Sequence, residues 1–232
     1  MRSVTSVRWA AVCGVAILSL AGATGSTRAA RAGGTIVGVV TTKEPPGPAI
    51  RVTIDQAACG ASLPDEAIVV DAAGHLANAV ITIAGLKGAP PAETTISNTG
   101  CRFVPRVSML RPGGSVKMTS TDPVLHTMRA STADGRALFN ISLPVPNMAV
   151  WRALDAAGPV QFACSTHPWM RGYVVVSADA AIVTGADGAF RVENVPPGTY
   201  DVQFWHESLH ASSARVTVKD GATATVNLVA VK

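Results

Sequence analysis

The sequence has few charged residues, few aromatic residues and no familiar catalytic motif. Charged residues make up 15% and aromatic residues 5% of the 232 positions. The chain lacks a Gly-x-Ser-x-Gly motif, a phosphate-binding glycine loop and paired catalytic carboxylates, so hydrolase and nucleotide chemistry have no support. Because 48% of the residues are hydrophobic and the 21 glycines follow no period, a disordered or collagen-like chain is also excluded.

The net charge of +4 comes from the start of the chain. The first 32 residues contain Arg2, Arg8, Arg28 and Arg31 and no acidic residue. The remaining residues carry 15 basic and 15 acidic side chains. This balance gives no electrostatic reason to expect nucleic acid or an anionic membrane as a partner.

Residues 1–32 have the pattern of a secretory signal peptide. Two arginines precede an apolar run of 15 residues, Trp9–Ala23, and Ala30-Arg31-Ala32 offers small residues at the positions that a signal peptidase reads. Fifteen helical residues rise about 22 Å, which is short of the roughly 30 Å hydrocarbon core of a membrane. We therefore predict cleavage after Ala32 and a periplasmic or secreted protein, with an uncleaved anchor as the alternative.

Residues 33–232 have the pattern of an all-β protein. Short segments rich in β-branched residues are separated by Gly, Pro, Asp or Asn, and several alternate apolar with polar residues. No window sustains the apolar spacing of a long helix, and residues 150–156 allow one or two helical turns. Antiparallel Greek-key β-sandwiches are the expected architecture. The expected strands are residues 35–40, 68–70, 80–83, 115–118, 138–143, 173–176, 200–205, 214–218 and 223–228.

Four motifs at the two ends of this region have a common texture of glycine-rich and valine-rich strands with regular turns. In order, they are Gly34-Thr35-Ile36-Val37-Gly38-Val39-Val40, Asn78-Ala79-Val80-Ile81, Thr184-Gly185-Ala186-Asp187-Gly188-Ala189-Phe190 and Val195-Pro196-Pro197-Gly198-Thr199-Tyr200. They resemble the carboxypeptidase regulatory-like, transthyretin-like β-sandwich. The resemblance implies one sandwich from residues 33–88 and 179–232, with residues 89–178 inserted in it. Two sequential domains divided near residue 180 are the alternative.

Three cysteines remain after the leader, and they differ in their surroundings. In an oxidising compartment two of the three can pair. Cys59 and Cys101 lie in turn-like segments without neighbouring metal ligands, so we expect a disulfide between them. Cys164 is left over, and metal ligation is a reason for an exported thiol to stay reduced.

Potential metal ligands gather around Cys164. His167 and Met170 follow it at intervals of three residues with a proline between them, so a tight loop can turn all three side chains toward one point, whereas a strand would alternate them. His126 lies 38 residues upstream, where Pro123 predicts a turn and a strand start. A thiolate, two imidazoles and a thioether form the ligand set of a type 1 (blue) copper site. Zinc is disfavoured because its structural sites use a fourth Cys or His rather than a thioether.

The segment Cys-Ser-Thr-His-Pro-Trp-Met-Arg-Gly-Tyr-Val-Val-Val, residues 164–176, is similar to the copper loop and following strand of cupredoxins of the plastocyanin and amicyanin type. The short Cys-x-x-His-x-x-Met spacing is closest to amicyanin. The resemblance covers roughly residues 100–178 and implies one copper ion. By this resemblance Cys164 is the thiolate ligand, His126 and His167 are the imidazole ligands, and Met170 is the axial ligand.

One position departs from the cupredoxin pattern. These proteins commonly place Asn directly after the first histidine, where it ties the two ligand segments together. Thr127 stands at that position here, which puts the hydrogen bond to the thiolate in question. The copper ligands themselves are all retained.

Four protein ligands leave no open position for a substrate, which favours electron transfer over catalysis. We therefore expect an exported type 1 copper protein, not an enzyme, that carries single electrons between redox partners. In cupredoxins the second histidine lies near the surface, which implies a redox partner docking near His167 and Trp169. Two alternatives stay open. One is a periplasmic copper-handling protein without a reversible couple, and the other is a cell-envelope binding or scaffold module with incidental metal.

Overall fold

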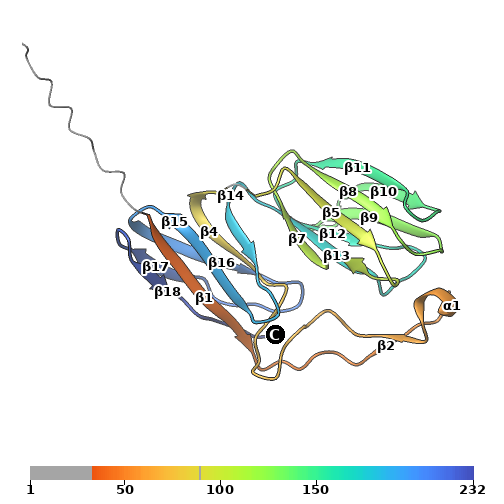
Figure 1. Ribbon diagram of the computed structural model, residues 1–232, viewed down its shortest axis with the longest axis horizontal. Coiled ribbons are helices and arrows are strands. Elements are labelled where there is room, and N and C mark those ends of the chain that lie inside the picture. The colour runs from red at the N-terminus through yellow and green to blue at the C-terminus, as the bar shows by residue number, and fades with distance from the viewer. Residues whose placement is uncertain (1–32, 89) are drawn as a thin grey trace, which may run out of the picture. The chain divides into compact units, whose positions relative to one another are not determined.

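Strands form nearly all of the regular structure in the residues that the structure describes, which are 33–88 and 90–232 (Figure 1). The computed structural model confirms the expected all-β fold, because these residues form four larger sheets, one two-stranded sheet and one four-residue helix. The predicted signal peptide, residues 1–32, lies outside the described residues. None of the helical structure in the described part of the chain is long and apolar enough to cross a membrane.

Two of the larger sheets pack face to face around one core, and we call them the terminal sandwich. In β1, buried and partly buried residues alternate along the whole strand, because successive side chains of a strand point to opposite faces. The buried face supplies Ile36, which packs in a core with Ile81, Phe190 and Val202. One sheet contains β15 (Ala189–Val195), β1 (Gly34–Thr42), β18 (Thr223–Thr225) and β19 (Leu228–Ala230), and the other contains β14 (Asp179–Val183), β4 (Val80–Lys87), β16 (Gly198–Trp205) and β17 (Ala214–Val218).

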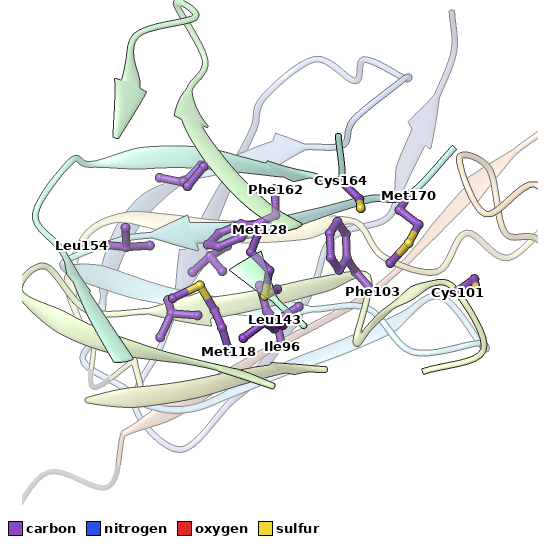
Figure 2. Packing of buried hydrophobic residues seen from close by; sticks show 14 of the residues in the cluster. Ile96, Cys101, Phe103, Met118, Met128, Leu143, Leu154, Phe162, Cys164 and Met170 are labelled. Carbon is purple, nitrogen blue, oxygen red and sulfur yellow. The ribbon is translucent and has the colours of Figure 1, made fainter. Parts of the chain in front are cut away.

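The other two larger sheets form the middle sandwich. Its core contains Met118, Met128, Leu143 and Phe162, and Figure 2 shows these side chains packed together with Cys164 and Met170 in the same cluster. One sheet contains β10 (Ala137–Leu143), β9 (His126–Thr132), β12 (Gly158–Ala163), β13 (Arg171–Val176) and β7 (Val107–Leu110), and the other contains β11 (Ala149–Leu154), β8 (Gly114–Ser120), β5 (Glu93–Asn98) and β6 (Phe103–Val104).

Strands from both ends of the chain share the terminal sandwich. β1 pairs with β15, β18 and β19, and β4 pairs with β14 and β16. The described strands from β5 to β13 pair among themselves in the middle sandwich. On this pairing we propose one domain of residues 33–88 and 179–232, with residues 89–178 as the inserted domain.

A segment between β1 and β4 reaches the middle sandwich, and we call its residues 52–63 the strap. It contains α1 (Gln56–Cys59) and lies between β2 (Ile50–Arg51) and the end of β3 (Ser62–Leu63). The expected disulfide between Cys59 and Cys101 is present, with Cα atoms 5.3 Å apart. Val52 is fully buried in the core of the middle sandwich. A covalent bond and apolar packing thus hold the strap against this sandwich.

Three of the expected elements take another form in the structure. Residues 149–154 form β11 instead of helical turns, because all six pair with β8. Residues 68–70 form no strand, since the turn that follows leaves only an isolated bridge between Val70 and Leu76. The expected strand 223–228 is divided into β18 and β19, because the two parts pair with different portions of β1.

Candidate metal centre

The four expected ligands come from two segments of the middle sandwich. His126 is the first residue of β9, just after the turn at Pro123. Cys164, His167 and Met170 lie in the loop between β12 and β13. This loop folds back because the Met170 N–H donates to the His167 carbonyl at 3.0 Å, and the Cys164 N–H donates to the Met170 carbonyl at 3.4 Å. The tight loop therefore returns the chain to Cys164 within a few residues.

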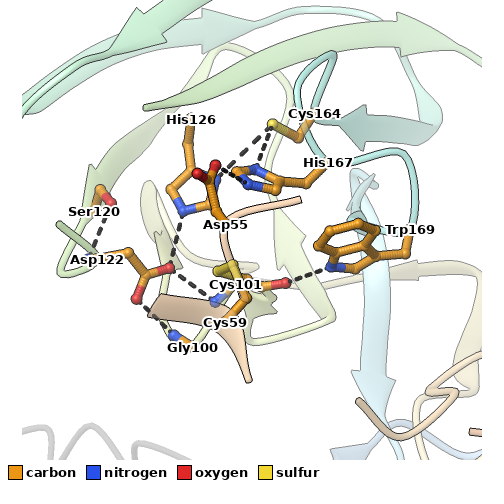
Figure 3. Close-up of a disulfide and its surroundings, with 10 residues drawn as sticks. All are labelled: Asp55, Cys59, Gly100, Cys101, Ser120, Asp122, His126, Cys164, His167 and Trp169. Atoms are coloured by element: carbon orange, nitrogen blue, oxygen red, sulfur yellow. Dashed lines mark hydrogen bonds and ion pairs between the residues drawn. A yellow bond between two sulfur atoms is a disulfide. The ribbon is translucent and has the colours of Figure 1, made fainter. Parts of the chain in front are cut away.

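Three of the expected ligand side chains meet at one point (Figure 3). The Cys164 Sγ lies 3.9 Å from His126 Nδ1 and 3.7 Å from His167 Nδ1. The imidazole rings have centroids 4.6 Å apart. Both histidines are fully buried and Cys164 is 4% exposed. Ligand atoms that come from distant parts of the sequence therefore converge in a site shielded from water.

The fourth expected ligand, Met170, is 1% exposed. It belongs to the same buried cluster as Cys164, and Figure 2 shows both residues at one end of that cluster beside Phe103. Its place in the loop is fixed by the backbone hydrogen bonds to His167 and Cys164.

The surroundings of Cys164 favour the thiolate. Burial by itself raises the pKa of this thiol, but its contacts with His126 and His167 and the hydrogen bond from the Thr127 N–H lower the pKa to about 5. The thiolate is the form of cysteine that binds metals. The side chain is thus in its ligating form at neutral pH.

Thr127 takes over the linking role that the cupredoxin pattern gives to Asn. Its N–H donates to Cys164 Sγ at 3.3 Å, and its hydroxyl oxygen lies 3.7 Å from the same sulfur. The hydroxyl oxygen also accepts the Ser165 N–H at 2.7 Å. The hydrogen bond that the sequence left in question is present, and β9 is tied to the ligand loop.

Each histidine has a carboxylate at the ring nitrogen that faces away from Cys164. The Nε2 of His126 lies 2.9 Å from Asp122 Oδ2, and the Nε2 of His167 lies 3.0 Å from Asp55 Oδ2. Asp122 also accepts the backbone N–H groups of Gly100 and Cys101 at 2.7 and 2.8 Å. When Nε2–H donates to a carboxylate, the lone pair of Nδ1 is free for a metal. Both rings therefore turn Nδ1 toward Cys164 and Nε2 toward a carboxylate.

Sequence reasoning missed both aspartates. Asp122 lies four residues before His126, and the Asp-Pro pair was interpreted only as a turn. Asp55 is separated from His167 by 112 residues and has no motif around it. A local pattern could have indicated Asp122, whereas Asp55 becomes visible only in the fold.

The surface position that the cupredoxin resemblance implies for His167 is not found. The side chain is fully buried, and Asp55 of the strap lies at its Nε2. Trp169 packs near it, with ring centroids 5.2 Å apart, and its indole N–H donates to the Cys101 carbonyl at 3.1 Å. The strap and its disulfide thus cover the edge of the ring that was expected to face solvent.

The donor atoms present fit a single copper ion. A first-row metal bonded at about 2.3 Å to sulfur and about 2.0 Å to nitrogen in a trigonal plane separates these atoms by about 3.7 Å. The observed separations of 3.9 and 3.7 Å between Cys164 and the two Nδ1 atoms match this value. Soft thiolate and thioether donors together with imidazole suit copper. The site could therefore hold copper without large side-chain movements.

Comparisons with known proteins find both resemblances again, each over part of the chain. A family model of the carboxypeptidase regulatory-like domain matches residues 170–231. No curated protein matches the chain.

Solved structures similar to the chain include cupredoxins. A purple cupredoxin from Nitrosopumilus maritimus is 27% identical, covers 36% of this chain and 99% of its own length, and has a TM-score of 0.32. Amicyanin from Paracoccus versutus is 17% identical, with 42% of this chain and 97% of its own covered and a TM-score of 0.34. A reduced amicyanin variant is 18% identical, with 42% and 98% covered and a TM-score of 0.34.

Proposed function

We propose that the protein is an exported type 1 copper protein that carries single electrons between redox partners. The observation that carries this proposal is the convergence of Cys164 Sγ with the Nδ1 atoms of His126 and His167 in a buried site. A structural cysteine needs no such partners, and two buried histidines with carboxylates on their outer nitrogens are typical of metal ligands.

The residues of the site would hold copper in a fixed arrangement. Cys164 would supply the thiolate, His126 and His167 the Nδ1 atoms, and Met170 the thioether. Bound copper supplies a one-electron couple between Cu(I) and Cu(II). Asp122 and Asp55 hold the two rings, and Thr127 holds the thiolate, so the ligands need little movement when the charge changes. Burial of all the donors excludes water from the site.

The same arrangement favours electron transfer over catalysis. With four protein ligands, no position is left for a substrate or an activated water, and such an open position is what catalytic metal sites keep. We therefore propose that the protein is not an enzyme. The thioether in the donor set is also the reason to prefer copper over zinc.

We further propose that the protein works in the periplasm or outside the cell. The Cys59–Cys101 disulfide supports this location, because disulfides persist in oxidising compartments. A redox partner would dock near His167 and Trp169. Because the strap covers His167, this partner would contact strap residues above the ring, and transient redox complexes need only a small interface.

The proposal is tested by adding Cu(II) to the purified mature protein and recording visible and electron paramagnetic resonance spectra. We expect one equivalent of copper and an intense thiolate-to-copper charge-transfer band. Cys164→Ser should abolish the band, and His126→Ala should weaken copper binding. Met170→Leu should keep the band and change the reduction potential, because only the thioether donor would be lost. Met109→Leu is the matched control, since Met109 is also buried but lies in a separate cluster.

The outcomes separate the three functions. A reversible one-electron wave in voltammetry supports the electron carrier. Tight Cu(I) binding without a reversible wave would instead indicate a copper-handling protein. Absence of stoichiometric copper binding by the wild type would overturn both and leave the binding or scaffold module, which the match to the regulatory-like domain at residues 170–231 would then favour.

A further inference from the structure

Asp55 has an unusual backbone conformation for an N-cap residue, and its side chain does not cap the helix. It precedes α1 as the N-cap residue, and its carbonyl accepts the N–H groups of Ala58 and Cys59, both at 2.9 Å. An aspartate at this position ordinarily uses its side chain to cap the helix. The Asp55 side chain makes no capping bond, and the residue adopts a left-handed conformation with φ of 53°.

The side chain that is withheld from the helix is used at the metal site instead. The Asp55 Oδ2 accepts from His167 Nε2 at 3.0 Å (Figure 3). A non-glycine residue with positive φ costs conformational energy, and such residues persist where the surrounding structure imposes them. The left-handed conformation of Asp55 therefore indicates that the surrounding fold, and not the local conformational preference of residues 52–63, places its side chain against His167.

The strap has independent anchors on both sides of Asp55. Cys59, four residues later, is bonded to Cys101. Val52, three residues earlier, is fully buried, and its carbonyl accepts the side-chain amide of Gln56 at 2.7 Å. The Val52 N–H donates to the Ala61 carbonyl at 3.0 Å, which closes the strap on itself. The backbone around Asp55 is thus held in place independently of the contact with His167.

The hydrogen bond with Asp55 supports the ring nitrogen of His167 that faces away from Cys164. Its Nδ1 faces Cys164 at 3.7 Å, and its ring lies between those of His126 and Trp169. The ring is fully buried, so water does not satisfy Nε2. Among the described residues, the Asp55 carboxylate is the hydrogen-bond partner found at Nε2.

We propose that Asp55 is a positioning residue of the copper centre, which orients His167 and tunes the metal from a segment outside the middle sandwich. This inference rests on the proposed function. A carboxylate that accepts the outer N–H of a ligating histidine fixes the ring and raises its basicity, and losing such a partner typically costs 10–100-fold in metal affinity. Its negative charge stabilises Cu(II) more than Cu(I), so it lowers the reduction potential.

The test compares Asp55→Asn and Asp55→Ala with Asp65→Asn. Asn tolerates the left-handed conformation and retains an oxygen that can accept from Nε2, so Asp55→Asn removes the charge alone. Asp55→Ala removes the charge and the hydrogen bond. Asp65 is the matched control, because it is another partly buried aspartate of the same connection whose Oδ1 accepts the Ala67 N–H, a bond that Asn can keep.

We expect Asp55→Asn to weaken Cu(II) binding about tenfold and to raise the potential by about 59 mV, the equivalent of a tenfold change for one electron. Asp55→Ala should weaken Cu(II) binding further. Both variants should keep the charge-transfer band, because Cys164 is unchanged. In the metal-free protein, nitrogen-15 spectra of the histidines should show a slowly exchanging proton on His167 Nε2 that Asp55→Ala loses and Asp65→Asn keeps.

Two kinds of failure can be told apart. A wild-type protein without a copper band overturns the proposed function and this inference with it. A wild-type protein with the band whose potential, Cu(II) affinity and Nε2 proton are the same in the Asp55 variants as in Asp65→Asn overturns the role of Asp55 alone. A shift in unfolding midpoint without a shift in potential would make Asp55 merely structural and would likewise overturn the inference.

Discussion

His206 is a histidine that the fold keeps neutral. It follows β16 and is 6% exposed. Burial lowers its pKa from 6.5, and the positive charge of Arg106 lowers it further, to about 4. Its Nδ1 accepts the Ser208 N–H at 3.2 Å, which only an unprotonated nitrogen can do. The folded state therefore binds a proton at this ring less readily than the unfolded state.

This difference predicts a loss of stability in acid. The stabilisation from the neutral ring is complete above the unfolded pKa of 6.5 and is lost as the pH falls toward the folded value of about 4. We expect the urea midpoint of the metal-free protein to decrease over this interval more in the wild type than in His206→Gln, whose side-chain oxygen can still accept the Ser208 N–H. A difference between the two proteins that stays constant with pH would contradict the assignment.

At the residue scale, the convergence of Cys164 with His126 and His167 could be predicted, but the hydrogen-bond partners of these residues could not. Cys164, His167 and Met170 share one loop, so their spacing alone indicated a common target. Thr127 was interpreted as a departure because a family pattern specifies a side chain. In the structure the bond to sulfur comes from its backbone N–H, which every residue except proline offers, and the hydroxyl supplies the link to Ser165.

At the element scale, the predicted strands lie where apolar and β-branched residues dominate, and β5 and β11 are two strands that the sequence did not predict. β5 has the sequence Glu-Thr-Thr-Ile-Ser-Asn, in which Ile96 is the sole large apolar residue, yet it pairs along its whole length with β8. β11 pairs along its whole length with the other edge of β8, in the antiparallel sense. Hydrophobic periodicity does not report backbone pairing with a distant partner, so neither strand was expected.

The attachment of the strap affects both the free energy of unfolding and the candidate metal site. Its disulfide spans 42 residues, and removal of a native disulfide from a small secreted domain costs about 2–5 kcal/mol. We expect the double variant Cys59→Ser, Cys101→Ser to unfold at a lower urea concentration. We also expect its copper potential to rise in the same direction as in Asp55→Ala, because the carboxylate is no longer fixed over His167.

A control separates the two effects of the disulfide. Combining the double cysteine variant with Asp55→Ala should change the potential little further, because the carboxylate is already displaced, whereas independent effects would add. The stability loss should be the same with and without Asp55. Additive shifts in potential would contradict the view that the disulfide acts on the copper through Asp55.

At the scale of the whole molecule, the site depends on a connection that belongs to the other sandwich. The chain enters the strap from β1 and leaves it toward β4, both of the terminal sandwich, while the strap itself packs on the middle one. Asp55 and His167 are therefore neighbours only because of this topology. The two β-sandwiches could be expected from motifs, but no motif contains the path of the strap.

Further contacts join residues of the two sandwiches. Arg106, just before β7, forms a two-pronged ion pair with Glu207, just after β16, in which Nη2 lies 2.8 Å from Oε2. Their side chains are only 10% and 5% exposed. Burial by itself lowers the pKa of Arg106, but the hydrogen bond and charge of Glu207 raise it overall, so the guanidinium stays charged. Tyr173 and Trp205 pack edge to face nearby, with ring centroids 5.3 Å apart.

A buried ion pair of this kind predicts that replacing one partner destabilises the protein more than replacing both. Glu207→Gln leaves the Arg106 guanidinium buried without its main counter-charge, since Glu66 lies farther away at 3.8 Å, and breaking such a pair costs about 3–5 kcal/mol. Replacing both partners, as in Arg106→Met with Glu207→Leu, leaves no buried charge and should cost much less. Urea unfolding of the two variants measures this difference. If the single variant were no less stable than the double variant, leaving the Arg106 guanidinium unpaired would carry no cost, and the assignment of a buried ion pair that stabilises the fold would be wrong.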